Sequence, residues 1–332
     1  MVPNEIELKD IFVDIHCFGK NPQGEGIVFV VRKNDYVIYS AIIDENIDKK
    51  FLTNEGIEKL DLICWTHPHD DHTEGLKETI KNFTSSKTKI VVPNGISDFR
   101  KYMSKKCKSA YKPIKRINRR NTRKNGEYIE AHSYTVIDYT YVDKNGQNLN
   151  IRINSLAPIS SRINNIRNNK KCNLNELSVC LLISVNDICF LFSSDIYNNV
   201  INDMNIDIEK FKNIIYYKIP HHGSEKSDHL LDSIPLSNDN RVAVSTIYKN
   251  NGKDMTPNIE LLNKYIEKGI KVYCTSESYM KNTKERCDFG IVSIRIQMKN
   301  TIQEENLKWD IKFAGEATEV EKIQEKNIFN VL

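Results

Sequence analysis

One short stretch constrains this chain more than any other: residues 60–76 read LDLICWTHPHDDHTEGL, an apolar run that ends in three histidines and two aspartates. The apolar run predicts a buried strand. The residues after the block, 73–83, have apolar side chains at helical spacing, and Thr73 is positioned to cap the first helical turn. A further strand is predicted over 89–94. The polar block therefore lies at the carboxyl end of a strand, where open α/β sheets bind their ligands.

Two other predicted strand ends carry residues of the same kind. A strand pair over 177–195 ends at Asp195, and a strand over 211–224 ends in His221 and His222. Imidazole nitrogen and carboxylate oxygen suit Zn²⁺, Mn²⁺ or Fe²⁺. Neighbouring residues on a strand point in opposite directions, so one of the paired histidines is expected to bind metal and the other to face substrate. The pattern leaves this choice open, and we assign the ligand to His222.

The spacing within the block predicts how ions are shared. His67 and His69 alternate on an extended backbone, so both project from one face and can share one ion. Asp71 and His72, further round the turn, can bind a second ion, and Asp195 is placed to bridge the two. The predicted metal ligands are His67, His69, Asp71, His72, Asp195 and His222.

The composition fits one globular domain. The chain has 332 residues, and we place a single domain at 1–314 and a charged tail at 315–332. Its eight cysteines are scattered without a CxxC pair, which indicates buried thiols rather than a zinc knuckle. The first residues are too polar for a signal peptide, and no apolar stretch reaches about 18 residues. We expect a cytoplasmic protein without membrane contacts.

The charge of the chain is strongly segregated. Residues 100–124 contain twelve lysines and arginines and no acidic residue, so the rest of a chain with net charge +4 carries −8. Because the periodicity here is weak, we interpret about 97–130 as a basic insertion; a second cationic stretch lies at 162–171. One-signed charge at this density costs self-repulsion unless an anion binds to it. The alternative is a solvated, mobile loop.

The remaining segments read mainly as strands and turns. Strands are predicted before residue 44 and over 133–159, with a short helix over 54–60 and a polar loop over 160–176. A longer helix over 258–269 is predicted to end at Gly269.

In its motifs and their order, the chain resembles the metallo-β-lactamase fold superfamily, whose HxHxDH motif matches THPHDDH. It is similar in particular to the competence-type (ComEC-like) branch of metal-dependent hydrolases. The shared features run from about residue 10 to 313: a QGEG turn, NELS with Asn175 and Ser178, FLFSSD ending at Asp195, and KIPHHGS. The resemblance implies an α/β fold, a four-layer αββα metallo-β-lactamase sandwich, here with a basic insertion.

Two departures from the superfamily pattern affect the site. A third histidine for the first ion is usual near the middle of the chain, where this sequence has Ala157 or Pro158. The ComEC-like branch also tends to lack it, so the ion shared by the first two histidines of the block should be loosely held. His132 could substitute for the missing ligand. The usual LIDGG reads IIDEN here, so Asp44 matches while the glycines do not.

The resemblance and metal chemistry together imply catalytic roles for Asp71, Asp195 and His221. Two divalent ions, Zn²⁺ or Mn²⁺, would lower the pKa of a bound water from about 15.7 towards 7 and polarise a phosphoryl or carbonyl oxygen. Asp71 would position that water. The predicted substrate contacts come from the motif loops and the basic insertion: Ser224, Asn175, Ser178, Lys115, Arg116, Arg119 and Arg120.

The basic insertion favours a polyanionic substrate. Clustered cations give sequence-independent affinity for phosphates, and the interleaved Tyr102 and Tyr111 could stack on bases. We therefore predict a metal-dependent phosphodiesterase, a nuclease whose partner is nucleic acid or another phosphate-bearing substrate. One alternative is hydrolysis of a small anionic substrate, such as a nucleotide, cyclic nucleotide or other phosphoester. Another is a non-catalytic module that binds nucleic acid or a partner on the same fold.

Overall fold

The structure is a computed structural model that describes residues 11–20, 24–120, 126–142, 146–168, 172–207, 211–235, 241–250, 254–277, 289–298 and 307–322. One mixed sheet is formed by β1 (Ile11–Lys20), β2 (Gly24–Lys33), β3 (Tyr36–Ile43), β4 (Leu62–Cys64), β5 (Lys89–Pro93), β6 (Glu127–Ala131), β16 (Phe289–Met298) and β17 (Lys308–Gly315). Its strand order is β17-β16-β1-β2-β3-β4-β5-β6. The pairs from β17 to β3 are antiparallel, and those from β3 to β6 are parallel.

The second mixed sheet is formed by β7 (Val136–Val142), β8 (Asn148–Ala157), β9 (Cys180–Val185), β10 (Ile188–Phe192), β11 (Ile214–Lys218), β12 (Val242–Ser245), β15 (Lys271–Cys274) and β18 (Thr318–Glu319). Its strand order is β18-β15-β12-β11-β10-β9-β8-β7, with parallel pairs from β10 to β15. A small hairpin of β13 (Tyr248–Asn250) and β14 (Asp254–Thr256) stands beside it.

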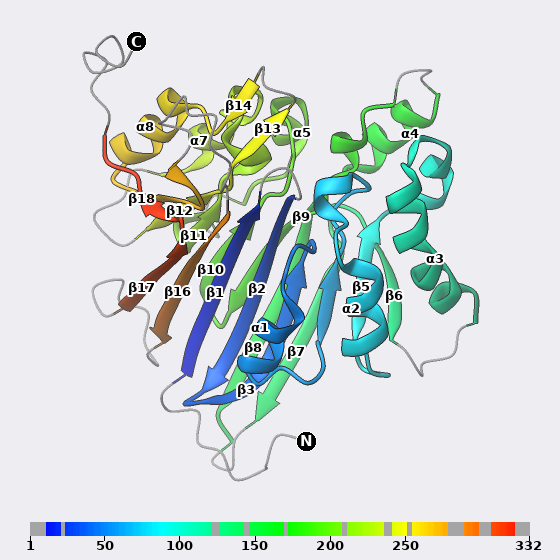
Figure 1. The fold of residues 1–332 in the computed structure, drawn as a ribbon, viewed down its shortest axis with the longest axis horizontal. Coiled ribbons are helices and arrows are strands. Elements are labelled where there is room, and N and C mark those ends of the chain that lie inside the picture. The colour runs from blue at the N-terminus through cyan, green and yellow to red at the C-terminus, as the bar shows by residue number, and fades with distance from the viewer. Residues whose placement is uncertain are drawn as a thin grey trace.

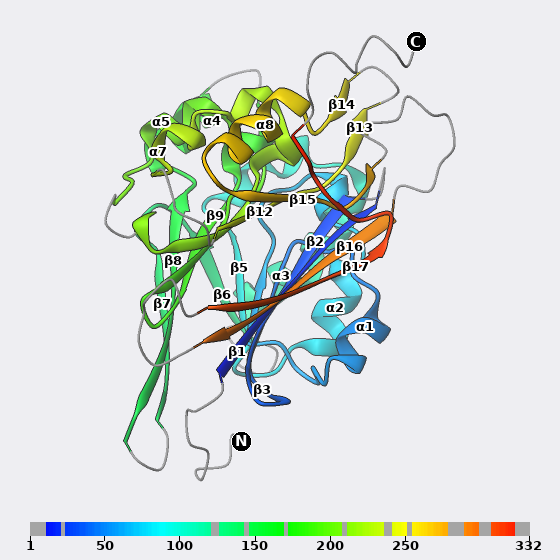
Figure 2. The same ribbon diagram turned by 90° about the vertical axis from the view of Figure 1, so that its left-hand side faces the viewer.

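Helices cover the outer faces of both sheets. On the first sheet lie α1 (Lys49–Asn54), α2 (Leu76–Phe83) and α3 (Lys105–Arg120), and on the second α5 (Asn198–Asp203), α7 (Leu230–Ser233) and α8 (Ile259–Glu267). Figures 1 and 2 show the two sheets as separate layers with these helices outside them. This arrangement confirms the predicted four-layer αββα sandwich. In the described part of the chain, no helix is long and apolar enough to span a bilayer.

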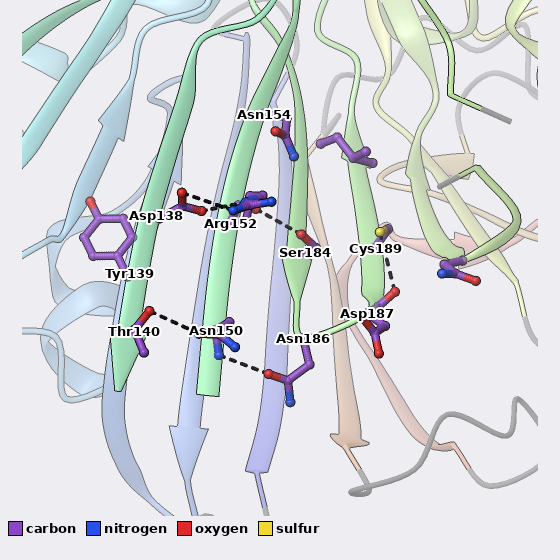
Figure 3. Close-up of a pocket in the computed structure, with 12 residues that line it drawn as sticks. Asp138, Tyr139, Thr140, Asn150, Arg152, Asn154, Ser184, Asn186, Asp187 and Cys189 are labelled. Carbon is purple, nitrogen blue, oxygen red and sulfur yellow. Dashed lines mark hydrogen bonds and ion pairs between the residues drawn. The ribbon is translucent and has the colours of Figure 1, made fainter. Parts of the chain in front are cut away.

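The core between the sheets follows from strand alternation. On β8, Leu149, Ile151 and Ile153 are buried against the other sheet, while the residues between them face outward. Aromatic rings close the middle of the sandwich, with the Phe29 ring centroid 5.4 Å from that of Phe190. On the outward face, β7 to β10 form a polar hollow of about 440 Å³, shown in Figure 3. Its Arg152 is paired with Asp138, and its lining residues include none of the predicted metal ligands.

The predicted ligand loops meet at one edge of the sandwich. The His/Asp block follows β4, Asp195 follows β10, and the paired histidines follow β11. Each of these strands has a parallel neighbour, and the carboxyl ends of parallel strands lie at the same edge of a sheet. The strand order therefore brings the three loops together from two sheets.

The basic segment is folded into the first layer. It contains a 3₁₀ helix, η2 (Ile96–Tyr102), then α3 and β6, which adds a parallel strand beside β5. Cys107, Ala110 and Ile114 of α3 are buried against α2 and the first sheet. Tyr111 is buried with them, so the expectation that its ring could stack on a base is wrong.

Several local predictions differ from the structure. The helix predicted over 54–60 is wrong, because residues 55–60 form turns and bends. The helix of this region is α1, Lys49–Asn54, and its N-cap is Asp48, whose side chain accepts from the Lys50 amide. The segment 160–176 is not a plain loop, since it contains α4 (Ser160–Asn168) and η4 (Leu174–Leu177). The N-cap of α2 is Gly75 rather than Thr73, because the Thr73 hydroxyl bonds the His69 carbonyl instead. The predicted tail from 315 contributes β18, and its last residues, 323–332, lie outside the described part.

Glu45 occupies the position where the superfamily pattern has glycine, and it is fully buried. Its Oε1 accepts a bond from the Thr79 hydroxyl at 2.9 Å, whereas Oε2 has no hydrogen-bond partner in the described part of the chain. Burial is the main cause that raises the pKa of Glu45 to about 8, against an ordinary value of 4.5. The folded protein therefore holds this carboxyl neutral at pH 7.

We predict that Glu45→Gln stabilises the protein at pH 8.5 relative to wild type and has a smaller effect at pH 5. The wild-type carboxyl has a raised pKa when folded, so its contribution to stability is complete below pH 4.5 and is lost as the pH rises to about 8. The amide has no such loss. Melting temperatures of both proteins across this range test the prediction, and parallel pH profiles would contradict it.

Candidate metal centre

The His/Asp loop is held by hydrogen bonds to buried side chains. Thr73 Oγ1 donates to the His69 carbonyl at 2.5 Å and accepts from Trp65 Nε1 at 3.1 Å. Beneath the loop, Gly24 at the start of β2 has a φ of 117°, and a Cβ there would lie 1.6 Å from the Asp71 carbonyl oxygen. Only glycine fits this position, which explains why the QGEG turn accompanies the motif.

The ligand side chains converge on Asp195, which is almost completely buried. Its Oδ2 lies 3.4 Å from His72 Nε2, 3.7 Å from His222 Nε2 and 3.9 Å from His67 Nε2. Asp71 Oδ2 completes the group at 3.4 Å from His72 Nε2 and 3.5 Å from His222 Nε2. We call the predicted ion site at His67 and His69 the first half of the centre, and the site at Asp71, His72 and His222 the second half. One carboxylate oxygen of Asp195 faces imidazoles of both halves, as a bridging ligand would.

The two halves differ in completeness. His67 Nε2 and His69 Nδ1 are 2.9 Å apart, so both can face one ion. The position expected for a third histidine holds the Ala157–Pro158 peptide. His132, the predicted substitute, is not among the residues that line the cavity over the ligands, and its Nδ1 lies 2.6 Å from the Ser133 carbonyl. Asp71, His72, Asp195 and His222 instead offer four ligand atoms within 4.8 Å of one another. The second half is therefore the fuller ligand set.

The paired histidines lie in a 3₁₀ turn, η5 (Pro220–Gly223), rather than on a strand. His221 and His222 have φ values of 48° and 53°, so the strand alternation used to separate them does not apply. The turn nevertheless divides them. His222 is buried, and its Nε2 faces Asp71 and Asp195, while the His221 side chain is 21% exposed and faces the cavity.

The unpaired polar atoms fit a divalent cation. Among the described residues, buried side-chain atoms without a hydrogen-bond partner include His72 Nε2, His222 Nε2 and Asp195 Oδ1. All three belong to the ligand set. Buried polar atoms are normally satisfied, and a cation bound by nitrogen and carboxylate oxygen would satisfy these. The residues present therefore fit a divalent metal, and the nature of the donors does not select one metal.

The electrostatic environment also favours a cation. Burial alone would lower the pKa of His72, but Asp195, Asp71 and Asp44 outweigh it and hold the pKa well above the usual value. Burial would likewise raise the pKa of Asp195, yet the surrounding histidines keep it well below its usual range. His67, by contrast, has its pKa lowered by burial and by His72 and His69. The His72 side of the centre therefore attracts positive charge more strongly.

Residues behind the ligands form a supporting layer that the sequence motifs mostly do not reveal. Asp44, which matched the superfamily pattern, accepts from His72 Nδ1 at 2.7 Å and from the Thr66 hydroxyl at 2.6 Å. Behind His222 stand Glu25, Thr246 and Lys218, all buried, and none was predicted as a site residue. The QGEG turn was the one available signal for Glu25.

A cavity of about 450 Å³ opens over the ligands. Of the predicted substrate residues, Asn175 lines it, and Asn175 Nδ2 lies 3.5 Å from His221 Nε2. Ser178 is fully buried, and Ser224 caps the short helix η6 (Glu225–Ser227), so neither reaches the cavity wall. Tyr248, which was not predicted, stacks on the His222 ring at a centroid distance of 5.0 Å.

The basic residues lie beside the cavity rather than in it. Tyr102, the last residue of η2, and Ser104, just before α3, are part of the wall, while Lys115 and Arg116 lie further along the helix. The side chains of Arg119 and Arg120 lie outside the described part. The arginines of α4 are less available to bind phosphate groups, because they already form ion pairs: Arg167 Nε with Asp98 at 2.8 Å and Arg162 with Asp203 at 2.7 Å.

No protein-family model matches the chain, and no curated protein matches it. Similar solved structures include the metallo-β-lactamase fold protein YhfI from Bacillus subtilis, at 14% identity, 74% of this chain, 75% of that chain and a TM-score of 0.31. A new diphosphatase from the PhnP family has 10% identity over 87% of this chain and 99% of its own, with a TM-score of 0.41. Igni18, a novel metallo hydrolase from Ignicoccus hospitalis, has 13% identity over 79% and 81%, with a TM-score of 0.34.

The fold rests on the described strand order, the outer helices and the position of the ligand loops, which together make the metallo-β-lactamase sandwich.

We predict that Asp195→Asn prevents the protein from retaining either ion after dialysis, because this carboxylate faces imidazoles of both halves. Wild type should retain metal, with the ion at His67 and His69 removed first by a chelator. The matched control is Asp138→Asn, an exposed carboxylate on β7. Elemental analysis of the dialysed proteins measures the effect, and equal metal content in the Asp195 variant would contradict the bridging role.

Proposed function

We propose that the protein is a metal-dependent phosphodiesterase that cleaves nucleic acid. The observation that carries the proposal is the continuity between the ligand set, the cavity over it and the basic helix α3, which begins directly after Ser104 of the cavity wall. A hydrolytic centre and a polyanion-binding surface would then act on the same substrate.

The cations of α3 form a stripe at helical spacing, opposite the buried face of the helix. The stripe consists of Lys105, Lys108, Lys112, Lys115 and Arg116, all exposed or half-buried. At about 1.5 Å per residue, it extends about 16 Å from the rim of the cavity. A row of this length suits several successive phosphates rather than one.

The stripe is fixed relative to the metal ligands. Ser104 Oγ donates to Asp70 Oδ1, and Cys107 Sγ donates to the Pro68 carbonyl at 3.2 Å. Lys106 forms an ion pair with Glu74 just after the block. A backbone held on α3 would thus be held at a defined position over the ligands, which is the main contribution a protein makes to phosphoryl transfer.

The side chains around the cavity have separate roles in the proposed reaction. Bound divalent ions would supply a water of lowered pKa and take up charge on a phosphoryl oxygen. Asp71, which is partly exposed beside the ligands, orients the attacking water. Burial lowers the pKa of His221, so its imidazole is neutral and, with Asn175, can contact substrate oxygens. Asp195 holds the two halves of the centre together.

A small phosphoester is the second candidate, because the cavity of about 450 Å³ would by itself hold a nucleotide. The five-cation stripe favours the polymer. Membership of the ComEC-like branch would agree with either substrate. A non-catalytic binding module is disfavoured by the open cavity over the ligands, since a purely structural metal site needs no access for substrate.

We predict cleavage of labelled DNA or RNA, single- or double-stranded, by purified protein with Mn²⁺ or Zn²⁺. Asp71→Ala/His72→Ala should abolish it, because both side chains belong to the fuller ligand set. Polymer cleavage that survives in this variant would point to a contaminant. Failure on all polymers, with metal-dependent hydrolysis of a small phosphodiester, would select the second candidate.

We further predict that Lys105→Gln/Lys108→Gln/Lys112→Gln weakens polymer cleavage about 10-fold or more at 150 mM salt and reduces its salt dependence, since phosphate contacts release counterions. Hydrolysis of bis-(p-nitrophenyl) phosphate should be unchanged. The matched control is Lys87→Gln/Lys271→Gln/Lys308→Gln, three exposed lysines at the opposite edge of the sheets. If both triple variants lose polymer cleavage to the same extent, the proposal that α3 binds the polymer is contradicted.

A further inference from the structure

Lys218, the last residue of β11, is a completely buried lysine that reaches across the sandwich. Its Nζ lies 2.9 Å from Glu25 Oε2 on β2 of the other sheet, and it also donates to the Ile219 carbonyl at 3.1 Å. A buried ion pair costs desolvation of both groups, so its presence beside the metal ligands calls for an explanation.

The pair is linked to a metal ligand through one hydroxyl. His222 Nδ1 lies 2.8 Å from Thr246 Oγ1 and 3.3 Å from Glu25 Oε2, and Thr246 Oγ1 in turn donates to the same Glu25 oxygen. All four side chains are buried. They form one chain of contacts: His222, Thr246, Glu25 and Lys218.

The direction of the hydrogen bonds follows from counting protons. A carboxylate beside a lysine ammonium can only accept, so the single hydroxyl proton of Thr246 points to Glu25. The Thr246 oxygen is then left to accept, and His222 Nδ1 must carry the proton that it accepts. In the neutral imidazole, His222 Nε2 is then left with its lone pair; this buried atom has no hydrogen-bond partner among the described residues and is directed at Asp71 and Asp195.

We propose that Lys218, Glu25 and Thr246 are positioning residues that hold His222 in the Nδ1-protonated tautomer and so set the affinity of the centre for its second divalent cation. Lys218 supplies the positive charge that keeps Glu25 an acceptor although Asp44 lies close by. Asp44 does the same for His72 directly, at 2.7 Å. The inference rests on the metal centre of the proposed function and is independent of which phosphoester is cleaved.

Thr246→Val is the primary test, because it removes the hydroxyl with little change in volume, whereas Thr246→Ser keeps it. We expect Thr246→Val to bind Mn²⁺ about 10- to 100-fold more weakly than wild type, the effect usual for such supporting residues, and Thr246→Ser to bind nearly as wild type. Lys218→Met should weaken binding in the same direction. Thr88→Val, which loses a buried hydroxyl bonded to the Leu60 carbonyl far from the site, should not.

Isothermal titration calorimetry with Mn²⁺ measures affinity, and circular dichroism establishes that each variant is folded. Nitrogen-15 NMR of the imidazoles reports the tautomer, which a merely structural role would leave unchanged. Wild type should show His222 protonated at Nδ1, and Thr246→Val should lose this preference.

The outcomes separate two kinds of failure. If wild type binds no divalent metal, the proposed function fails. If wild type binds metal and folded Thr246→Val and Lys218→Met bind it equally well with the same tautomer, the positioning role is overturned and the metal centre stands.

Discussion

Buried negative charge at one edge of the sandwich imposes the dominant physical constraint on this protein. Glu25, Asp44 and Asp195 are buried there, and the partly exposed Asp71 lies beside them; the four carboxylates come from both sheets. Isolated carboxylates are costly to bury, so each must face a histidine, a hydroxyl, an ammonium or a bound cation. The geometry of the loops follows from this requirement, because it fixes which atoms may approach each oxygen.

The two sheets meet this constraint in different ways. Around His72, Asp44 provides a carboxylate directly, and its left-handed backbone, with a φ of 57°, turns the side chain under the loop. Around His222, the carboxylate is Glu25 of the opposite sheet. It supports His222 through the Thr246 hydroxyl and is itself paired with the buried Lys218. Both ligand histidines therefore present Nε2 towards Asp195, although they are supported by different chemistry.

The basic helix shows how charge and packing can be combined in one element. Its buried face anchors it on α2 and the first sheet, and its first residues bond to the His/Asp loop. The opposite face is free to carry cations, since burial on one side already holds the helix in place. Positive charge is thus fixed beside a negatively charged centre without neutralising it.

The amino-acid order alone specifies the chemistry of the centre and the edge of the sheet at which it lies. An apolar run followed by a polar block is a local pattern, so His67, Asp71 and Asp195 can be assigned to strand ends from the sequence, and the fold class follows from the same motifs. The packing of α3 was not predicted, although Cys107, Ala110, Tyr111 and Ile114 recur at helical spacing, because two of these four side chains are small and they stand among many cations.

The pairing of Lys218 with Glu25 and the separation of His221 from His222 were likewise decided by the three-dimensional fold. The ion pair joins residues that are distant in the chain and belong to different sheets. The two histidines are separated by a left-handed turn, and no local pattern encodes that turn because its backbone conformation is unusual for residues other than glycine.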